Sequence, residues 1–533
     1  MSEKILRITE ISVRGSTSLF FGGIFQTVVL AVGSIIVARM LGPSDYGLYA
    51  IALVVPTLLV SLTDLGLNHA MIYLLAKWRE EGRTRSASRI LEFGLAIRLL
   101  VGLASSLFII MWADTLAVYL LNRPELANLV RIGFVIVIFE GVFNWAFAAF
   151  IGLDRMGMNA ILGGVLSAVK VVASIGLILL GFGFAGAVVG VLFSFFVAGT
   201  AGVLLLLTEM RKTCTPSLGS TLGFKDSLRT MVGYGFPIHV GSVIDVAVGQ
   251  LEFVLLAYFV SNLEIGNFHV ASNFAVLFTT ITVPITSAIF PMFSKFNPES
   301  EASDVAGVFA AATKYASLLV VPTAALVIVL SQKLVYAVYG PSYDLAPLFL
   351  SMATIYFLYS GIGSTILVGF LRGVGQTRLP LVIVVVNALA FGAAAPMLTY
   401  MYGIKGLIAA SLISSFVSLL YGFLKARATY GVWVDGAAQA RIYVSAGLST
   451  LPVLLVVHFS GLSILMTLIV GGFVYLAAYL TMCPIIGAVR DQDIHTLRLI
   501  FRRIRFGWQL LSLPLAYEAK LCSIVSSLRP RRL

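Results

Sequence analysis

The chain has 533 residues, of which 59% are hydrophobic and only 11% are charged, and its formal net charge is +12. Soluble globular proteins carry about 25% charged residues, so this composition excludes soluble enzymes, transcription factors and secreted disulfide scaffolds. The apolar residues come in runs of about twenty, the length that crosses a bilayer core. The sequence therefore predicts an all-α polytopic membrane protein, and membrane topology is expected to account for the positive charge.

Polar, glycine-bearing or proline-bearing breaks divide the chain into fourteen expected transmembrane helices. They run roughly over 17–40, 47–75, 90–112, 129–152, 159–180, 184–208, 231–260, 265–293, 305–330, 345–370, 379–401, 404–425, 441–460 and 463–487. The first helix follows Lys4, Arg7 and Arg14 as in a signal peptide. It is too long for one and no small-residue cleavage site ends it, so we interpret it as a retained anchor.

Lysine and arginine indicate the orientation of these helices. Fourteen spans place both termini on one side, and the connections and tails of that side hold 28 of the 36 basic residues. The opposite connections hold five, which are Arg39, Arg123, Arg131, Lys333 and Lys405. By the positive-inside rule both termini are expected to be cytoplasmic, in a plasma or inner cell membrane.

The tail after residue 488 has a different pattern. Apolar residues recur at helical spacing between 497 and 511, and arginines fill the positions between them. One interpretation is a basic amphipathic helix that lies on the anionic cytoplasmic leaflet. The other is a loosely ordered tail that only obeys the positive-inside rule.

Cofactor and metal chemistry have no signature in this sequence. The three cysteines are far apart without CxxC spacing, and the five histidines form no HxxxH or HExxH pair, so neither a metal site nor a disulfide framework is indicated. No GxxxxGK[ST] motif is present, which argues against direct use of ATP.

The two halves of the sequence resemble one another. Gly47 and Gly266, and the alanines around them, match at an offset of 219, and Arg98 matches Lys314 at an offset of 216. This repeat predicts two pseudo-symmetric six-helix lobes around a central cavity. The expected organisation is an N-terminal lobe at 1–208, a cytoplasmic linker at 209–230, a C-terminal lobe at 231–425, two extra helices at 441–487 and the tail at 488–533.

Several turn and packing elements carry a family resemblance. Residues 39–47 (RMLGPSDYG) are similar to the R-x-L-G-P-x-x-Y-G signature of polysaccharide-biosynthesis membrane proteins of the O-antigen flippase type. Residues 64–67 (DLGL), 340–343 (GPSY) and 369–373 (GFLRG) resemble other recurring elements of that family. The resemblance covers about 1–490. It implies membership of the multidrug/oligosaccharidyl-lipid/polysaccharide exporter superfamily, with spans one, two, seven and eight lining a central cavity.

Charges inside the membrane are the informative positions, because an ionisable group in hydrocarbon usually faces a cavity or a partner. Lys170 and Glu140 are both expected near the midplane. One interpretation is a structural ion pair. The other is that Lys170 binds the phosphate of a lipid headgroup, with Glu140 as its partner in the empty state.

Arg98 and Lys314 lie nearer the cytoplasmic end of spans three and nine. Their long stems allow them to snorkel to that interface, which would leave them a packing role only. Their symmetric placement in the two halves favours a second interpretation, in which both cations face the cavity and attract an anionic headgroup.

Other polar residues are expected along spans one, two and seven. In the repeat, Gln26 corresponds to Asp245, and Asp64 and His239 add ionisable groups to the same cavity. These residues are candidates for binding sugar or a coupling H+ or Na+, although Asp64 can also cap neighbouring backbone. Arg39 and Glu252 are expected near the outer surface, where they can pair and gate the cavity.

The sequence thus predicts a non-enzymatic flippase that moves a polyprenyl-(pyro)phosphate-linked oligosaccharide to the outer leaflet by alternating access. We expect a monomer without cofactors, driven by an ion gradient or the membrane potential. The alternatives are a cation-coupled multidrug exporter or a peptidoglycan-precursor flippase of the same superfamily. A membrane glycan polymerase or transferase is disfavoured, because the outer connections are short and hold no carboxylate constellation.

Overall fold

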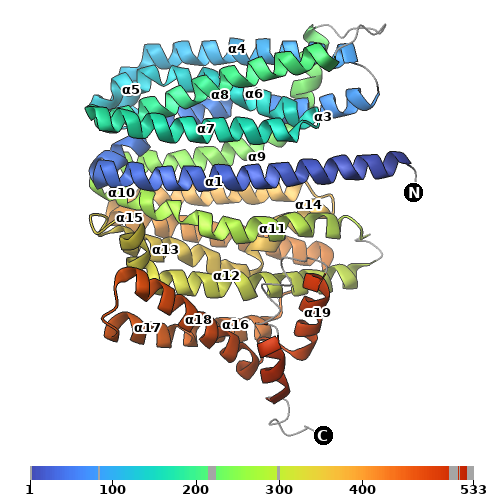
Figure 1. Ribbon diagram of the computed structural model, residues 1–533, viewed down its shortest axis with the longest axis vertical. Coiled ribbons are helices and arrows are strands. Elements are labelled where there is room, and N and C mark those ends of the chain that lie inside the picture. Colours follow the sequence, from blue (N-terminus) through green and yellow to red (C-terminus); the bar gives the residue numbers. More distant parts are fainter. Residues whose placement is uncertain are drawn as a thin grey trace. The chain divides into compact units, whose positions relative to one another are not determined.

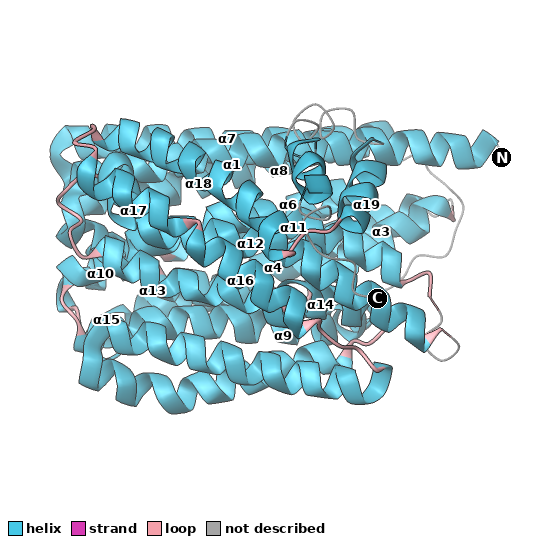
Figure 2. Cartoon of the chain, turned by 90° about the horizontal axis from the view of Figure 1, so that it is seen from below, coloured by secondary structure: helices cyan, strands magenta, loops and turns pink. Residues whose placement is uncertain are grey.

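A computed structural model describes residues 3–81, 84–213, 224–296, 301–502, 514 and 516–524. These residues form helices joined by turns and short loops, and they include no strand (Figure 2). The prediction of an all-α membrane protein is therefore confirmed.

The chain divides into two compact units. The first contains residues 1–269 with 395–407, and the second contains residues 270–394 with 408–533. Helix α9 (Phe224–Phe259) and residues 262–269 belong to the first unit, although the repeat places them at the start of the second half of the sequence. The described residues of α9 therefore pack with the N-terminal helices.

The first unit is built from long helices connected by short turns (Figure 1). Besides α9 it contains α1 (Glu3–Ala52), α2 (Val54–Thr63), α3 (Leu67–Glu80), α4 (Thr84–Thr115), α5 (Ala127–Ile132), α6 (Phe134–Gly152), α7 (Met156–Leu177), α8 (Gly183–Thr213) and the first part of α10 (Asn262–Asn273). Apolar side chains of α3, α4, α6, α7 and α8 form one buried cluster. Met71, Ile90 and Phe150 lie in it fully buried, which fixes these five helices against one another.

The second unit is likewise built from helices that pack around buried apolar clusters. It contains α11 (Ala275–Phe293), α12 (Ala302–Val338), α13 (Ala346–Leu358), α14 (Ser364–Gly373), most of α15 (Arg378–Tyr430), α16 (Gly436–Leu448), α17 (Thr450–Phe459), α18 (Ile464–Ile486) and α19 (Asp491–Arg502). One buried cluster surrounds Phe309 and Phe370, and another surrounds Tyr475 and Tyr479 of α18. The C-terminal helices therefore share a core with α12.

Ten helical segments among the described residues are long and apolar enough to cross a membrane, or eleven if a bent pair at 346–373 counts as one span. Three of them run for 43, 54 and 53 residues, whereas about 20 residues cross the bilayer core. Each of these three contains a glycine with non-helical backbone, as at Gly42. The number of fourteen crossings stays a prediction.

Large apolar side chains are exposed along these segments. Leu100, Leu180 and Phe459 have exposed fractions of 70%, 73% and 83%. In water such a surface would associate, whereas in a bilayer it faces acyl chains at no cost. The exposed surface therefore fits a multi-pass membrane protein.

The described residues of the tail are helical from Asp491 onward. Helix α19 begins with two acidic residues, Asp491 and Asp493, and ends at Arg502. Residues 503–513, which carry part of the amphipathic pattern seen in the sequence, lie outside the described residues. Contact of this tail with an anionic leaflet stays a prediction.

Candidate functional site

The site begins at the turn between α2 and α3, two helices that the sequence predicts as one transmembrane span. Helix α2 ends at Thr63 and α3 begins at Leu67, and between them Leu65 and Gly66 have positive φ angles of 50° and 78°. This turn breaks the i→i−4 hydrogen-bond ladder. It leaves the carbonyl oxygens at the end of α2 available to side chains, as in the discontinuous helices of transporters.

Helix α9 approaches this turn closely. A Cβ atom on Gly235 would lie 1.9 Å from the carbonyl oxygen of Gly66, so only glycine permits the contact. Helix α3 packs along α9 beside it. The backbone of α9 is thereby held against the interruption.

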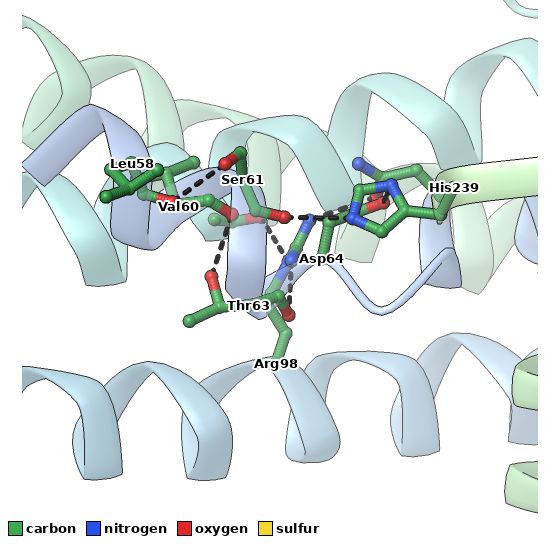
Figure 3. A network of polar contacts seen from close by, with 9 residues as sticks. Leu58, Val60, Ser61, Thr63, Asp64, Arg98 and His239 are labelled. Carbon is green, nitrogen blue, oxygen red and sulfur yellow. Dashed lines mark hydrogen bonds and ion pairs between the residues drawn. The ribbon is translucent and has the colours of Figure 1, made fainter. Parts of the chain in front are cut away.

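Arg98 of α4 donates into the interruption (Figure 3). Its Nη2 lies 2.6 Å from Oδ1 of Asp64 and 3.3 Å from Oδ1 of Asn68, and its Nη1 lies 3.1 Å from the carbonyl oxygen of Thr63. Its Nε lies 3.0 Å from the carbonyl oxygen of Gly141 in α6. With only 3% of its surface exposed, Arg98 is a buried cation that joins three elements through four acceptors.

His239 of α9 completes the network from the other side (Figure 3). Its Nδ1 lies 3.3 Å from Oδ2 of Asp64, and its Nε2 lies 2.9 Å from the carbonyl oxygen of Ser61. Both partners are acceptors. A neutral imidazole has one N–H and satisfies one of them, whereas an imidazolium donates to both. When the ring is protonated, both acceptors are satisfied and Asp64 serves two cations at once.

A second charged group lies next to this network. Glu140 of α6 interacts electrostatically with Lys170 of α7 and with Arg98, which binds the carbonyl group next to it in the chain. Both Glu140 and Lys170 are half-buried. The structure thus brings four of the predicted residues, Asp64, Arg98, Glu140 and Lys170, into one chain of charge interactions, which His239 joins through Asp64.

The other predicted residues of the first unit lie on α1 and α9. Gln26 of α1 packs over Gly163 of α7. Asp245 is exposed and Glu252 is half-buried, both on α9, and Arg39 is exposed on α1. Pairing of Arg39 with Glu252 as an outer gate stays a prediction.

Lys314 belongs to the second unit. Its Nζ lies 2.6 Å from Oδ2 of Asp493, which also accepts a hydrogen bond from the backbone N–H of Arg490. The tail helix α19 therefore supplies the counterion of this cation. Asp493 lies outside the sequence repeat, and nothing in the pattern of the tail indicated a partner for Lys314.

Glu518, in the helical residues 516–524, is buried near Asp493. Burial and the negative charge of Asp493 raise the pKa of Glu518 from 4.5 to about 7. The folded tail therefore binds a proton more tightly than the unfolded tail. The stabilisation that this proton brings is complete below about pH 4.5 and is lost as the pH rises through 7.

Glu518→Gln is expected to raise the free energy of unfolding at pH 8 by up to about 3 kcal/mol and to change little at pH 4.5. Thermal unfolding in detergent from pH 4.5 to 8 measures the difference between variant and wild type. Glu125→Gln, at an exposed glutamate, is the control. An identical pH profile for Glu518→Gln and wild type would contradict the assignment.

Sequence reasoning missed two kinds of contact in the first unit. The acceptors on Ser61, Thr63 and Gly141 are backbone groups, which every residue carries, so no residue type marks them. The contacts of Arg123 are the other omission: it donates to Asn262 and to the carbonyl groups of Ala257 and Val260 at the end of α9. In the sequence it was counted only as one of five basic residues in the outer connections. Its signal was its position directly before Pro124 in a short polar connection.

These features define a class of protein, a multi-pass helical membrane protein whose first unit contains an interrupted helix and buried charges. A family model described as polysaccharide biosynthesis protein matches residues 36–347, more than half of the chain. The chain belongs to this family, which confirms the resemblance seen in the sequence.

Solved structures share the fold. A structure of the lipid II flippase MurJ in an inward closed conformation matches with a TM-score of 0.68 at 14% identity, covering 87% of this chain and 98% of that chain. An inward-facing multidrug resistance MATE family transporter of the MOP superfamily matches with a TM-score of 0.63 at 17% identity, covering 76% and 94%. A MOP superfamily transporter from Pyrococcus furiosus matches with a TM-score of 0.55 at 17% identity, covering 79% and 95%. No curated protein matches the chain.

Proposed function

We propose that this protein is a flippase that moves a polyprenyl-(pyro)phosphate-linked oligosaccharide from the cytoplasmic to the outer leaflet. The observation that carries the proposal is the match of residues 36–347 to the polysaccharide biosynthesis family. The fold shared with transporters and a flippase supports it. Such a substrate needs a polar path for its charged head while its lipid tail stays in the bilayer, and the buried charges of the first unit supply polar groups in an apolar chain.

The distribution of basic residues supports an orientation with both termini in the cytoplasm. In that orientation His239 and the interruption after α2 lie toward the cytoplasmic leaflet, where the substrate is loaded. Alternating access then exchanges inward-open and outward-open states. This is transport without covalent chemistry, in a single copy of the chain and in the plasma or inner membrane.

Lys170 is the principal headgroup residue in this proposal. Its counterion Glu140 is only half-buried and interacts with two cations, so an incoming phosphate competes with a shared carboxylate. Arg98 already donates to four protein acceptors, and Lys314 is paired with Asp493. These two cations contribute to phosphate binding by exchanging a carboxylate partner for the phosphate.

The coupling ion in this proposal is a proton on His239. The ring makes both of its contacts only when it is doubly protonated, so proton binding and closure of this contact are linked. Asp245 and Gln26 line the route of the head or of a coupling ion, and Arg39 and Glu252 gate its outer end. Anionic lipids at the cytoplasmic tail complete the set of proposed partners.

Lipids that remain bound after gentle purification test the substrate. We expect mass spectrometry to find a polyprenyl-phosphate glycan on wild type and at least about tenfold less of it on Lys170→Ala, because the loss of one charge-assisted contact costs about 1.5–3 kcal/mol. Lys405→Ala removes an exposed lysine of α15 and is the matched control.

Three outcomes are informative. Equal recovery from Lys170→Ala and wild type would retain the flippase and remove the headgroup site. Recovery of lipid II would favour the second candidate, which the likeness to the lipid II flippase supports. Recovery of ordinary phospholipid alone would contradict the glycan substrate, and export of cationic drugs would be the next assay.

A further inference from the structure

The end of α9 opposite His239 is held by a second set of polar contacts. Nε of Arg123, in the connection after α4, lies 2.8 Å from Oδ1 of Asn262, the first residue of α10. Its Nη1 lies 2.9 Å from the carbonyl oxygen of Ala257, and its Nη2 lies 3.1 Å from that of Val260. Nη1 also donates to the carbonyl group of Asn122 at 2.8 Å. One guanidinium therefore caps the C-terminus of α9 and the start of α10.

Two of the acceptors of Arg123 are carbonyl groups at the C-terminal end of α9. The last carbonyl groups of a helix have no intrahelical partner and carry the negative end of its dipole. The backbone N–H that follows α9, on Ser261, is directed to the side chain of Glu264 instead. The planar fork of an arginine meets two such carbonyl oxygens and the side-chain oxygen of Asn262 at once, which the single ammonium group of a lysine does not.

The connection that carries Arg123 is itself fixed. Its backbone N–H donates to the carbonyl group of Ala117 at 2.8 Å, and Pro124 follows it at the start of a 3-10 turn. Proline disfavours helical backbone in the residue before it, and Arg123 is accordingly non-helical, with a φ of −141° and a ψ of 83°. The fixed backbone positions the guanidinium, so binding its acceptors costs less conformational entropy than it would from a free loop.

Two further contacts join the same end of α9 and α10 to the N-terminal helices. The hydroxyl group of Tyr258 donates to the carbonyl group of Tyr119. Gly47 and Gly266 meet backbone to backbone, since a Cβ on Gly266 would lie 1.8 Å from the carbonyl oxygen of Pro43. This end of α9 and α10 is therefore closed against the N-terminal helices through side-chain hydrogen bonds and a close backbone contact.

The two polar attachments of α9 are a membrane thickness apart. Val260 follows His239 by 21 residues, which is about 30 Å along a helix. The hydrocarbon core has about the same thickness. The attachment through His239 and the attachment through Arg123 therefore lie at opposite faces of the bilayer.

We propose that Arg123 is the outer latch of the transport cycle, a positioning residue that holds α9 and α10 against the N-terminal helices while the outer face is closed. Its release accompanies opening toward the outer leaflet. The inference rests on the proposed transport function for its role in the cycle, whereas the latch itself is a statement about conformation.

Spin-label distances test the latch without substrate. The labels are placed on Glu125→Cys and Leu263→Cys, on either side of the latch, in a background without the native cysteines. We expect Arg123→Ala to increase the population of long distances about tenfold, because the closed state loses the three hydrogen bonds to α9 and α10. Arg123→Lys is expected to resemble Arg123→Ala, since it retains the charge and loses the fork.

A variant that strengthens the contact distinguishes loss of the latch from misfolding. Asn262→Asp gives Arg123 a carboxylate acceptor at the N-terminus of α10, and we expect it to lower the population of long distances below that of wild type. Arg131→Ala is the control, because Arg131 pairs with the exposed Asp114 in the same region. Wild-type distances in Arg123→Ala, or an equal change in Arg131→Ala, would overturn the latch.

The result separates the two proposals. Wild-type distances in Arg123→Ala, with the polyprenyl glycan still bound to the purified protein, would remove the latch and leave the flippase. A population that shifts as expected, in a protein that carries no such glycan, would retain the latch and remove the substrate.

Discussion

Arg98→Ala is expected to lower the free energy of unfolding by about 3–5 kcal/mol, since it leaves the buried Asp64 carboxylate without its closest cation. It also leaves the carbonyl groups of Thr63 and Gly141 without their side-chain donor. Arg98→Lys is expected to recover only part of the loss, because one ammonium group cannot reach acceptors on two sides. Thermal unfolding in detergent measures these changes.

A double-mutant cycle separates the ion pair from the other contacts. The combined Arg98→Ala and Asp64→Ala variant is expected to lose about 1–3 kcal/mol less than the sum of the single variants, because the second change removes a charge that the first left unpaired. Arg131→Ala, which breaks an exposed ion pair, should cost less than about 1 kcal/mol. A cost for Arg98→Ala no larger than that of Arg131→Ala would contradict the network.

His239→Gln is expected to abolish a pH-dependent separation of α9 from the turn between α2 and α3. In wild type the imidazolium donates to Asp64 and to the carbonyl group of Ser61, so protonation favours the closed contact. When the ring loses its second proton, one donor is lost and the open population grows. Spin labels on Lys77→Cys of α3 and Arg229→Cys of α9, both exposed, measure the distance between these two helices.

The variant should show the wild-type high-pH distances at every pH, because glutamine does not titrate. His69→Gln is the matched control, since His69 is exposed on α3 close to the network in sequence. A pH dependence that persists in His239→Gln would assign the proton to another group. Distances that do not change with pH in wild type would contradict proton coupling at this contact.

The fold class followed from the sequence because hydropathy acts over local windows. Runs of about twenty apolar residues become helices in a bilayer whatever their neighbours are, and the glycine and proline at 42–43 interrupt α1 where the sequence indicated a turn. The family resemblance at 39–47 was likewise local, and the family match confirms it.

The partners within the site were less accessible to sequence reasoning. Asp64, Arg98 and His239 were each selected because a charge in hydrocarbon requires a partner. Which partner each one has depends on how α2, α4 and α9 pack, and the residues are up to 175 positions apart. The repeat suggested equal roles for Arg98 and Lys314, yet their counterions come from α2–α3 and from the tail, which the repeat does not relate.

The sequence repeat correctly paired two glycines whose backbones are in contact. Gly47 and Gly266 match at the offset of 219, and their backbones touch. Their contact is therefore a point at which the two sequence repeats come together.

His239 and the carbonyl groups at the end of α9 that Arg123 contacts lie on one uninterrupted helix. The rotation of α9 about its axis is therefore as constrained as its length. Each residue added to or removed from the stretch between them turns one end by about 100° relative to the other and would point the ring or the carbonyl groups away from their partners. The lipid-facing side chains of this stretch are free to vary in identity, but their number is not. Over evolutionary time α9 should therefore accept substitutions readily and insertions hardly at all.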